Sequence, residues 1–503
     1  MTDLAFEKGR ELLDRLLSKV IVEDDYGLLA QIVESHMFVC AALKEKNATI
    51  RKLQHMLFGA ATEKASTIIP ELKKMAHPRH EAPKGHGRNG ASSYTGGTKV
   101  PLSHTSLNKG DLCPECRKGK VYPTDAGLTV RISGSAPLTA TSFEREKLRC
   151  NLCGEVFTAS APCEEKYDAT SGAMIALLRY GTGVPFKRLE RLQDALGIPL
   201  PASTQWDIVE KTAMPARPVY KELIRQAAQG EIVHNDDTTM KVLAPADEGR
   251  KGTFTTGMLS VAGEKKIALF VTGHHHAGEN LADLLAQRHG DLSPPIQMCD
   301  ALSRNVPKEF STLLANCLAH ARRNFIDVAE SFPDECRHVI ETMAKVYEND
   351  AKTKEMSPEE RLAYHEARSG PLMEDLRKWM NAQFGEKRVE PNSGLGKAFS
   401  YMLAHWDPLT LFLRVPGTPL DNNAVERVLK MAIRHRKNSL FFRTLHGAYV
   451  GDIFMSLIHT CNLSKVNPFD YLVALQKHSH EVFKHPEEWL PWNYEGAARP
   501  CLH

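Results

Sequence analysis

The chain has 503 residues, of which 42% are hydrophobic and 25% are charged, and its formal net charge is +3. This length predicts several domains, and the composition is typical of a soluble globular protein. No apolar run approaches the roughly 18 residues that a membrane helix needs, and the acidic N-terminus lacks the apolar stretch of a secretion signal. We therefore expect a cytoplasmic protein.

Charge is unevenly distributed along the chain. Residues 1–43 hold 4 basic and 8 acidic side chains, whereas residues 44–120 hold 15 basic and 6 acidic ones. A second basic stretch, residues 421–443, holds 6 Lys or Arg residues against 2 acids. Basic segments on a nearly neutral protein indicate local contact with phosphate. Solvated surface charge explains any one such run equally well.

The first predicted element is a helix over residues 29–57, within a helical segment that we bound at 1–64. Apolar residues recur in it at alternating steps of three and four, which is typical of a short coiled coil. We expect this helix to join copies of the chain into a homo-oligomer, and packing on its own chain is the alternative. Residues 65–105, rich in Gly, Pro, Ser and His with several basic residues, predict a flexible basic linker.

Two CxxC pairs follow in the segment 106–165. They are Cys113 with Cys116, and Cys150 with Cys153. Two such pairs in one small segment predict a Cys₄ zinc ribbon, in which each pair forms one knuckle. Four thiolates leave no open coordination position, so we expect a structural Zn²⁺. The odd total of 11 cysteines, most of them scattered, is typical of a reducing compartment.

Residues 166–225 predict a helical segment that is similar to a helix–turn–helix module. One helix is expected at Val184–Leu192, a turn at Gly197–Pro199, and a second helix from Ala202. In such modules the second helix enters the major groove of DNA, whereas many helix pairs of this kind only pack together. The candidate DNA-contacting residues of this segment are Lys187, Arg188, Ser203 and Gln205.

From residue 231 onwards the pattern changes to short strands. They are expected at Ile232–Leu243, Thr253–Val261, Lys266–Thr272, Pro295–Cys299 and Leu313–Leu318, with a helix at Leu281–Gln287. Three successive strands, followed by strands that alternate with helices, predict a mixed α/β sheet such as a ribonuclease-H-like core. We assign this catalytic core to residues 226–332 and 392–465. A helical insertion separates the two parts at 333–391, and a helical tail follows at 466–503.

Three isolated carboxylates in this core, Asp236, Asp300 and Glu426, are candidates for metal-dependent chemistry. The first two lie in or directly after strand-like runs, and the third lies in a basic helix that begins near Asn422. Carboxylates suit Mg²⁺ or Mn²⁺, and two such ions can activate a water or a 3′-hydroxyl and stabilise the leaving oxygen of a phosphodiester. Each acid alone would more often be an ordinary surface residue. Strand alternation leaves open whether Asp236 or Asp237 faces the site.

Basic residues accompany these acids. On the Glu426 helix they recur at steps of three and four, which places positive charge along one side for phosphate contact; the candidates are Arg427, Lys430, Arg434, Arg436 and Lys437. A second group, His320, Arg322 and Arg323, follows the fifth strand. The run His274–His276 predicts a surface loop or a substrate contact, because three consecutive rings cannot all face one ion.

At these motifs the chain resembles the DDE transposases of bacterial insertion sequences, specifically the insertion-sequence-66 family. The resemblance begins at Arg51–Gly59, continues through the CxxC pairs, and is densest from 392 to 472, where it includes Asp421–Arg427 and Arg436–Asn438. Three positions differ from the usual pattern, although none of them removes a carboxylate. Asn235 replaces Ala, Leu302 stands near the second acid where an aromatic is common, and Leu318 replaces Trp.

This resemblance implies a ribonuclease-H-like core split by a helical insertion, with Asp236, Asp300 and Glu426 as the catalytic, Mg²⁺-binding acids. It also implies that the zinc-ribbon and helix–turn–helix-like segments bind DNA. We expect His320, Arg322 and Arg323 to help position DNA, and simple packing is the alternative for His320. The expected partners are double-stranded DNA, at the transposon ends and at the target, and accessory proteins of the same element. The expected location is the bacterial nucleoid. Two alternatives remain open: a nuclease or resolvase that does not join strands, and a catalytically inert zinc-ribbon DNA-binding protein.

Overall fold

The computed structural model describes residues 101, 106–123, 135–149, 151, 153, 155–160, 165–244 and 252–498. All of them belong to one of the two compact units into which the chain divides, Ala82–His503. The predicted coiled coil at 29–57 lies outside the described residues, as does the linker at 65–105 apart from residue 101. Among the helices that the structure describes, none has the length and apolar character needed to cross a membrane.

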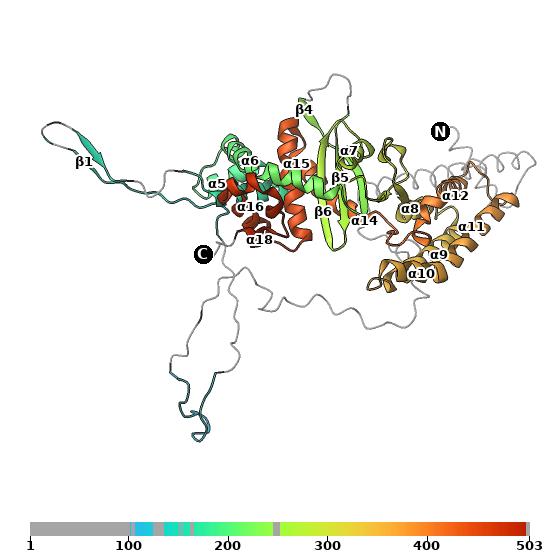
Figure 1. The fold of residues 1–503 in the computed structure, drawn as a ribbon, viewed down its shortest axis with the longest axis horizontal. Helices are drawn as coiled ribbons and strands as arrows, with labels where there is room; N and C mark the ends of the chain where they lie inside the picture. The colour runs from blue at the N-terminus through green and yellow to red at the C-terminus, as the bar shows by residue number, and fades with distance from the viewer. Residues whose placement is uncertain are drawn as a thin grey trace, which may run out of the picture. The chain divides into compact units, whose positions relative to one another are not determined.

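A mixed sheet of five strands forms the centre of the region that holds the candidate acids (Figure 1). Its order is β6-β5-β3-β7-β8, in which β3 pairs antiparallel with β5 and β5 with β6, whereas β3, β7 and β8 are parallel. The strands are β3 (Ile232–Thr239), β5 (Phe254–Ala262), β6 (Lys265–Gly273), β7 (Ile296–Cys299) and β8 (Leu313–Asn316). The prediction of a mixed α/β sheet is therefore confirmed. A short bridge pairs β4 (Val242–Ala244) with β9 (Phe442–Thr444).

Helices cover both faces of this sheet. Helix α14 (Asn423–Ser439) packs against β5 and β3. Helix α7 (Ala277–Leu285) packs on the opposite face, where Asn280 donates a hydrogen bond of 2.7 Å to Thr256 Oγ1. The sequence placed α7 at Leu281–Gln287; it begins earlier because Glu279 accepts a hydrogen bond from the backbone N–H of His276 at its N-terminus.

Helix α15 (Leu445–Leu463) closes the β6 edge of the sheet. Three backbone N–H groups of β6 donate to polar side chains that lie one turn apart on α15: Ala268 to Thr460, Phe270 to Ser456 and Thr272 to Asp452. An open edge strand would leave these groups unpaired and would invite pairing with other chains. The buried polar residues of an otherwise apolar helix therefore serve the sheet.

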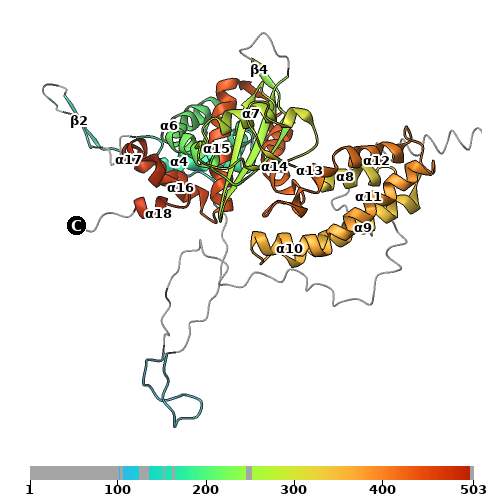
Figure 2. The same cartoon turned by 45° about the vertical axis from the view of Figure 1, so that its right-hand side comes forward.

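Three helices lie between α8 (Leu318–Ile326) and α12 (Gly394–Ala404), in the region predicted as a helical insertion (Figure 2). They pack on one another and on α8, and they are α9 (Pro333–Lys352), α10 (Pro358–Arg368) and α11 (Gly370–Gly385). Helix α10 begins with a capping box, in which Ser357 and Glu360 exchange hydrogen bonds. The chain then returns to the sheet through α13 (Trp406–Leu409) and η5 (Leu411–Leu413).

The segments on either side of the sheet region form a second helical layer. Helix α6 (Ala202–Ala227) packs on α15 and on the helices of the C-terminal tail. The other members are α4 (Ala169–Ala176), η3 (Leu177–Gly181), α5 (Phe186–Ala195), α16 (Pro468–Lys477), α17 (Ser479–Lys484), η6 (Pro486–Trp489) and α18 (Tyr494–Ala497). The predicted turn between α5 and α6 contains Gly197 at a φ of +74°. The second helix is longer than the sequence suggested, because its buried stripe continues from Gln205 to Ala227.

Candidate active site

Asp236 and Asp300 come together through parallel strand pairing. His234 of β3 pairs with Met298 of β7. Asp236 and Asp300 each lie two residues further on, so they are level with each other at the carboxyl ends of these two strands. Asp300 follows directly after Cys299, the last residue of β7. Two carboxylates 64 positions apart in the sequence are thus placed on neighbouring backbones.

Glu426 reaches the carboxyl ends of these strands on helix α14, which approaches the sheet closely at a glycine. Gly257 of β5 pairs with Asp236, and a Cβ atom at Gly257 would lie 2.8 Å from Leu429 Cγ and 3.7 Å from Val425 Cγ2. The absence of a side chain at Gly257 lets these two residues pack onto the strand. Glu426 follows Val425 on the same helix, and its charge acts on Asp236.

The electrostatic state of Asp236 reflects this grouping. Its pKa is raised from the ordinary value of 3.8 to about 7, chiefly by burial and then by the charges of Asp300, Asp237 and Glu426, against a backbone N–H bond from Asp237 that lowers it. Among the described residues, no basic side chain forms an ion pair with Asp236. A carboxylate in this state gains stabilisation from a bound cation.

A divalent cation suits this set of donors. Three carboxylates with repelling charges are hard oxygen ligands of the kind that Mg²⁺ and Mn²⁺ prefer. Within the part of the chain that the structure describes, no three His, Cys, Asp or Glu side chains converge closely enough to enclose an ion. Asp236, Asp300 and Glu426 are therefore neighbours whose side chains must move closer together to share a metal.

Asp237 points to the opposite face of the sheet from Asp236. Its side chain is only 2% exposed, and its carboxylate lies 2.9 Å from His276 Nδ1 and 3.3 Å from Arg304 Nη2. It therefore ties the loop after β6 to the loop after β7. The two successive acids that strand alternation could not separate have different neighbours: Asp236 faces the other carboxylates, and Asp237 contacts His276 and Arg304.

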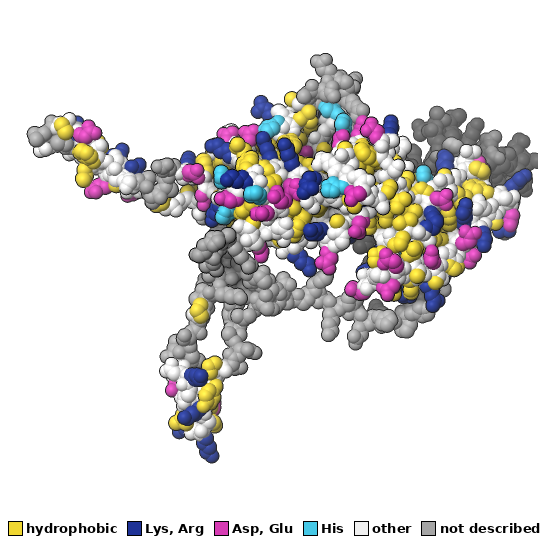
Figure 3. All heavy atoms as spheres, viewed as in Figure 1, with side chains coloured by type: hydrophobic (Ala, Val, Ile, Leu, Met, Phe, Trp, Pro, Cys, Tyr) yellow, Lys and Arg dark blue, Asp and Glu magenta, His cyan; other side chains and the backbone are white. Residues whose placement is uncertain are grey.

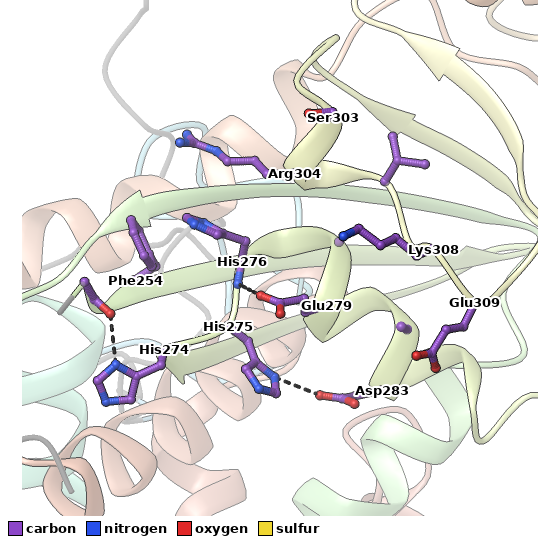
Figure 4. Close-up of a pocket in the computed structure, with 14 residues that line it drawn as sticks. Phe254, His274, His275, His276, Glu279, Asp283, Ser303, Arg304, Lys308 and Glu309 are labelled. Atoms are coloured by element: carbon purple, nitrogen blue, oxygen red, sulfur yellow. Dashed lines mark hydrogen bonds and ion pairs between the residues drawn. The ribbon is translucent and has the colours of Figure 1, made fainter. Parts of the chain in front are cut away.

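The three consecutive histidines line a hollow of about 630 Å³ beside the contacts of Asp237 with His276 and Arg304 (Figure 4). Each ring has its own partner: His274 bonds to the carbonyl of Gly252, His275 lies 3.3 Å from Asp283, and His276 bonds to Asp237. In Figure 4 the loop that carries Arg304 forms the facing wall. This arrangement agrees with the predicted surface loop and leaves the three rings no common centre.

On α14 the candidate basic residues divide into two groups. Arg436 Nη1 turns inward and donates to Thr238 Oγ1 at 2.9 Å and to the carbonyl of Thr239 at 2.6 Å, which fastens the helix to β3. The other four are exposed and recur at steps of three and four: Arg427, Lys430, Arg434 and Lys437. These four side chains are available to phosphates, whereas Arg436 has a structural partner.

At the start of α8, His320 lies next to the third acid. Its Nε2 is 3.7 Å from Glu426 Oε1. Helix α8 is held there because the N–H of Leu318 donates to the carbonyl of Leu420, just before α14. Arg322 and Arg323 follow on the same helix and are partly exposed. The second group of candidate basic residues therefore borders the carboxylates.

The helix pair α5–α6 presents only part of its predicted DNA-contacting set to solvent. Lys187, Arg188 and Ser203 are exposed. Gln205 is fully buried, and its amide donates to the carbonyls of Phe186 and Leu200 at 3.0 and 2.9 Å. Its burial argues against a DNA contact, because the side chain faces α5. Sequence pattern could not reveal this, since a polar residue one turn into a helix more often faces solvent.

The first CxxC pair lies in a turn that backbone hydrogen bonds hold together. The N–H of Cys113 donates to the carbonyl of Gly119 at 2.8 Å, and the N–H of Gly119 lies 3.4 Å from Cys116 Sγ. That N–H lowers the pKa of the Cys116 thiol, as do a backbone bond from Lys118 and a bond from Cys113. Thiolate is the form that binds Zn²⁺. Cys113, Cys116 and Cys153 are free thiols, and Cys150 lies outside the described residues.

The second pair lies beside a small hairpin. Strands β1 (Lys147–Arg149) and β2 (Val156–Thr158) pair antiparallel on either side of Cys150 and Cys153. Of the described residues between the two strands, Asn151 and Cys153 lie in a turn.

Comparison with known proteins agrees with this geometry. The model of the transposase IS66 family matches residues 166–449. The chain belongs to the transposase IS66 family. The matched residues include all three candidate carboxylates and the five-stranded sheet. They also include the helices α9, α10 and α11, which lie between the two parts of the predicted core.

Similar chains occur in Sinorhizobium fredii (strain NBRC 101917 / NGR234). Uncharacterized protein y4hP is 26% identical over 385 residues, covering 70% of this chain and 68% of that protein. Uncharacterized protein y4jD is 27% identical over 371 residues, covering 70% and 72%. Uncharacterized protein y4qI is 24% identical over 349 residues, covering 65% and 62%. Their names carry no activity, so the family match and the site geometry carry the functional argument.

Proposed function

We propose that this chain is a DDE-type DNA transposase that cuts DNA at the inverted repeats of its own element and transfers the ends into target DNA. The observation that carries the proposal is the grouping of Asp300 and Glu426 around a partly buried Asp236 whose pKa is about 7. Membership of the transposase IS66 family supports it. The order of the five strands, with β5 antiparallel to both neighbours, is compatible with a ribonuclease-H-like core.

In this proposal Asp236, Asp300 and Glu426 hold Mg²⁺ or Mn²⁺. When bound, such ions activate the attacking water or 3′-hydroxyl and stabilise the leaving 3′-oxygen. The chain positions the acids: β3 and β7 hold two of them level, and α14 delivers the third. Three carboxylates of like charge repel one another, and bound cations reduce this repulsion. The site is therefore more stable with metal bound than with three ionised acids and no metal.

Double-stranded DNA is the proposed substrate, with the exposed residues of α14 contacting its phosphates. Arg427, Lys430, Arg434 and Lys437 would follow the backbone next to Glu426, and His320, Arg322 and Arg323 would approach from α8. On the face seen in Figure 3, basic and acidic side chains are interspersed. Phosphate contact on that face would therefore be local, as the net charge of +3 suggests.

The segments outside this core have proposed supporting roles. The four cysteines Cys113, Cys116, Cys150 and Cys153 would hold a structural Zn²⁺, and the α5–α6 pair would add DNA contacts through Lys187, Arg188 and Ser203. Residues 29–57 would join copies of the chain. Accessory proteins of the same element would complete the reaction if the isolated chain binds DNA without cutting it.

A strand-transfer assay tests the proposal directly. Labelled DNA from the ends of the element is incubated with purified protein, Mg²⁺ and a supercoiled target. We expect joined products that disappear in Glu426→Gln, with DNA binding retained. Glu374→Gln is the matched control, because that glutamate is 52% exposed on α11, away from the three acids.

Each of the other outcomes would lead to a different conclusion about this chain. Normal cutting and joining by Glu426→Gln would show that the third acid is wrongly assigned. Metal-dependent cutting without joining would indicate a nuclease or resolvase. Binding without cutting, unchanged by the neighbouring reading frames of the element, would indicate an inert DNA-binding protein.

A further inference from the structure

Three amide side chains are fully buried beside Asp300. Asn235 lies on β3, Gln297 on β7, and Asn305 in η4 (Ser303–Asn305), the short turn that follows Asp300; each is 0% exposed. Buried amides are costly unless their hydrogen bonds are made. Their position next to a candidate metal ligand therefore calls for an explanation.

Two of these amides fix the backbone of the third. The carbonyl of Asn305 accepts hydrogen bonds of 2.7 Å from both Asn235 Nδ2 and Gln297 Nε2. Gln297 Nε2 also lies 3.0 Å from Asn235 Oδ1, and Gln297 Oε1 accepts from Thr312. The backbone at residue 305 is thus tied to the two strands that carry Asp236 and Asp300.

The side chain of Asn305 serves a different purpose from its backbone. Its Nδ2 donates a hydrogen bond to Asp300 Oδ1, which also receives a longer bond of 3.4 Å from the N–H of Leu302. Among the described residues, both hydrogen bonds to the Asp300 carboxylate are thus on Oδ1, and Oδ2 accepts none. The network anchors Asn305 through its carbonyl, and the Asn305 amide then restricts the rotation of the carboxylate.

We propose that Asn305 is a positioning residue that holds the Asp300 carboxylate in the orientation that binds metal, with Oδ2 left for the ion. This inference rests on the proposed function, because it takes Asp300 as a metal ligand. Hydrogen-bond partners of metal ligands orient those ligands, and their loss typically costs about 10- to 100-fold in metal affinity or activity. A purely structural Asn305 would act through its carbonyl, which every substitution retains.

The separation of the two roles makes Asn305→Ala a selective test. The variant removes the bond to Asp300 and keeps the carbonyl that Asn235 and Gln297 use. Asn280→Ala is the matched control, since Asn280 is also a buried asparagine, 5% exposed, whose amide donates to Thr256 Oγ1 and touches no candidate acid. Both variants lose one buried amide, and only one of them loses a contact with a carboxylate.

Mn²⁺ binding, measured by the loss of the free-ion electron paramagnetic resonance signal, is the readout. We expect Asn305→Ala to bind Mn²⁺ about 10- to 100-fold more weakly than the wild-type chain, and Asn280→Ala to bind it as the wild type does. DNA binding should not change, and high Mn²⁺ should restore cutting by Asn305→Ala. Asn305→Leu, which is close to asparagine in size but has no hydrogen-bond donor, carries the same expectation if the alanine variant fails to fold.

Two results separate this inference from the proposed function. Equal Mn²⁺ affinity in the wild-type chain and in Asn305→Ala, or an equal loss in Asn280→Ala, would overturn the positioning role alone. Equal Mn²⁺ affinity in the wild-type chain and in Asp236→Asn would instead overturn the metal site, and the role of Asn305 with it.

Discussion

Gly257 lies opposite Asp236 in the antiparallel pair of β5 and β3, and Leu429 of α14 packs where a side chain at residue 257 would be. One residue without a Cβ thus sets the distance between the sheet that carries two acids and the helix that carries the third. The consequence is a direct link between packing and chemistry at this site.

Gly257→Ala should therefore impair cutting more than DNA binding. The new methyl group would lie 2.8 Å from Leu429, so α14 must move outward, at a cost of about 1–3 kcal/mol in the free energy of unfolding. Urea unfolding and strand-transfer assays on the same variant measure both effects. At Gly273→Ala, the control, a Cβ meets no atom within 4 Å. Equal activity of the two variants would show that the close approach is not needed.

Asp236 should lower the stability of the metal-free chain as the pH rises towards 7, whereas His435, whose pKa burial lowers from 6.5 to about 3, contributes with the opposite sign. The pKa of Asp236 is raised from 3.8 to about 7, so between these values the folded chain holds a proton that the unfolded chain has lost, and a rise in pH favours unfolding. Burial raises the pKa of Asp452 to about 7 as well, which adds a contribution of the same sign. Urea unfolding from pH 4 to 8 measures the sum.

Adding Mg²⁺ and substituting Asp236→Asn distinguish the contribution of Asp236 to the pH dependence from that of Asp452. Asp236→Asn should flatten part of this pH dependence and leave the part due to Asp452. Mg²⁺ at pH 8 should stabilise the wild-type chain and not the variant, because binding to the folded state alone shifts the equilibrium. Parallel pH profiles of the two proteins would contradict the raised pKa of Asp236.

Asp452→Ala should destabilise the sheet at its β6 edge. The carboxylate accepts bonds of 2.7 Å from the N–H and the hydroxyl of Thr272, and alanine would leave that buried N–H without a partner. An unsatisfied buried donor costs about 1–3 kcal/mol. Asp452→Asn retains an acceptor and should lose less. A smaller loss in the alanine variant than in the asparagine variant would refute this role.

Neutralising the outer face of α14 should weaken DNA binding at all sequences. The triple variant Lys430→Ala, Arg434→Ala and Lys437→Ala removes three phosphate contacts, so the slope of log affinity against log salt should fall by about 2–3. Fluorescence anisotropy from 50 to 200 mM salt measures this slope. Arg436→Ala is the control: its guanidinium bonds to Thr238 and Thr239, so its loss should reduce stability more than the salt slope. An unchanged slope in the triple variant would place the DNA elsewhere.

Cys113→Ser should release zinc if the four cysteines form one site. Metal analysis of the purified wild-type chain should give one Zn²⁺ per chain, and the variant should lose it together with its resistance to proteolysis between residues 106 and 165. Cys461→Ser, a buried free thiol in α15, is the control that should retain zinc. Zinc retention by both variants would exclude a four-cysteine site.

Much of the sheet could be predicted from the sequence, because its strands follow strong local patterns. The run that ends at Cys299 is apolar except for Gln297, and the positions of Asp236 and Asp300 relative to such runs were visible. Strand pairing was not visible, because register depends on contacts across the sheet. Hence strand alternation left Asp236 and Asp237 undivided, the resemblance favoured Asp236, and the structure gives each acid its own neighbours.

The parts that sequence reasoning missed depend on long-range contacts. Gln205 has the polarity of a DNA contact, but it lies against α5 because its amide satisfies two carbonyls there. The Asn305 network joins residues as much as 70 positions apart, so no local spacing marks it. A polar Gln297 inside an apolar strand was the available signal, since such a residue must find buried partners.

Because α15 covers the β6 edge of the sheet, a growing chain can aggregate through that edge until α15 has been synthesised. Thr272 meets Asp452 across 180 residues, so a ribosome must complete most of the chain before the sheet loses its exposed edge. A copy of the gene interrupted before Leu445 would still encode all five strands of the sheet, but without the helix that shields them. Such truncated products should self-associate instead of accumulating as inactive competitors at DNA ends.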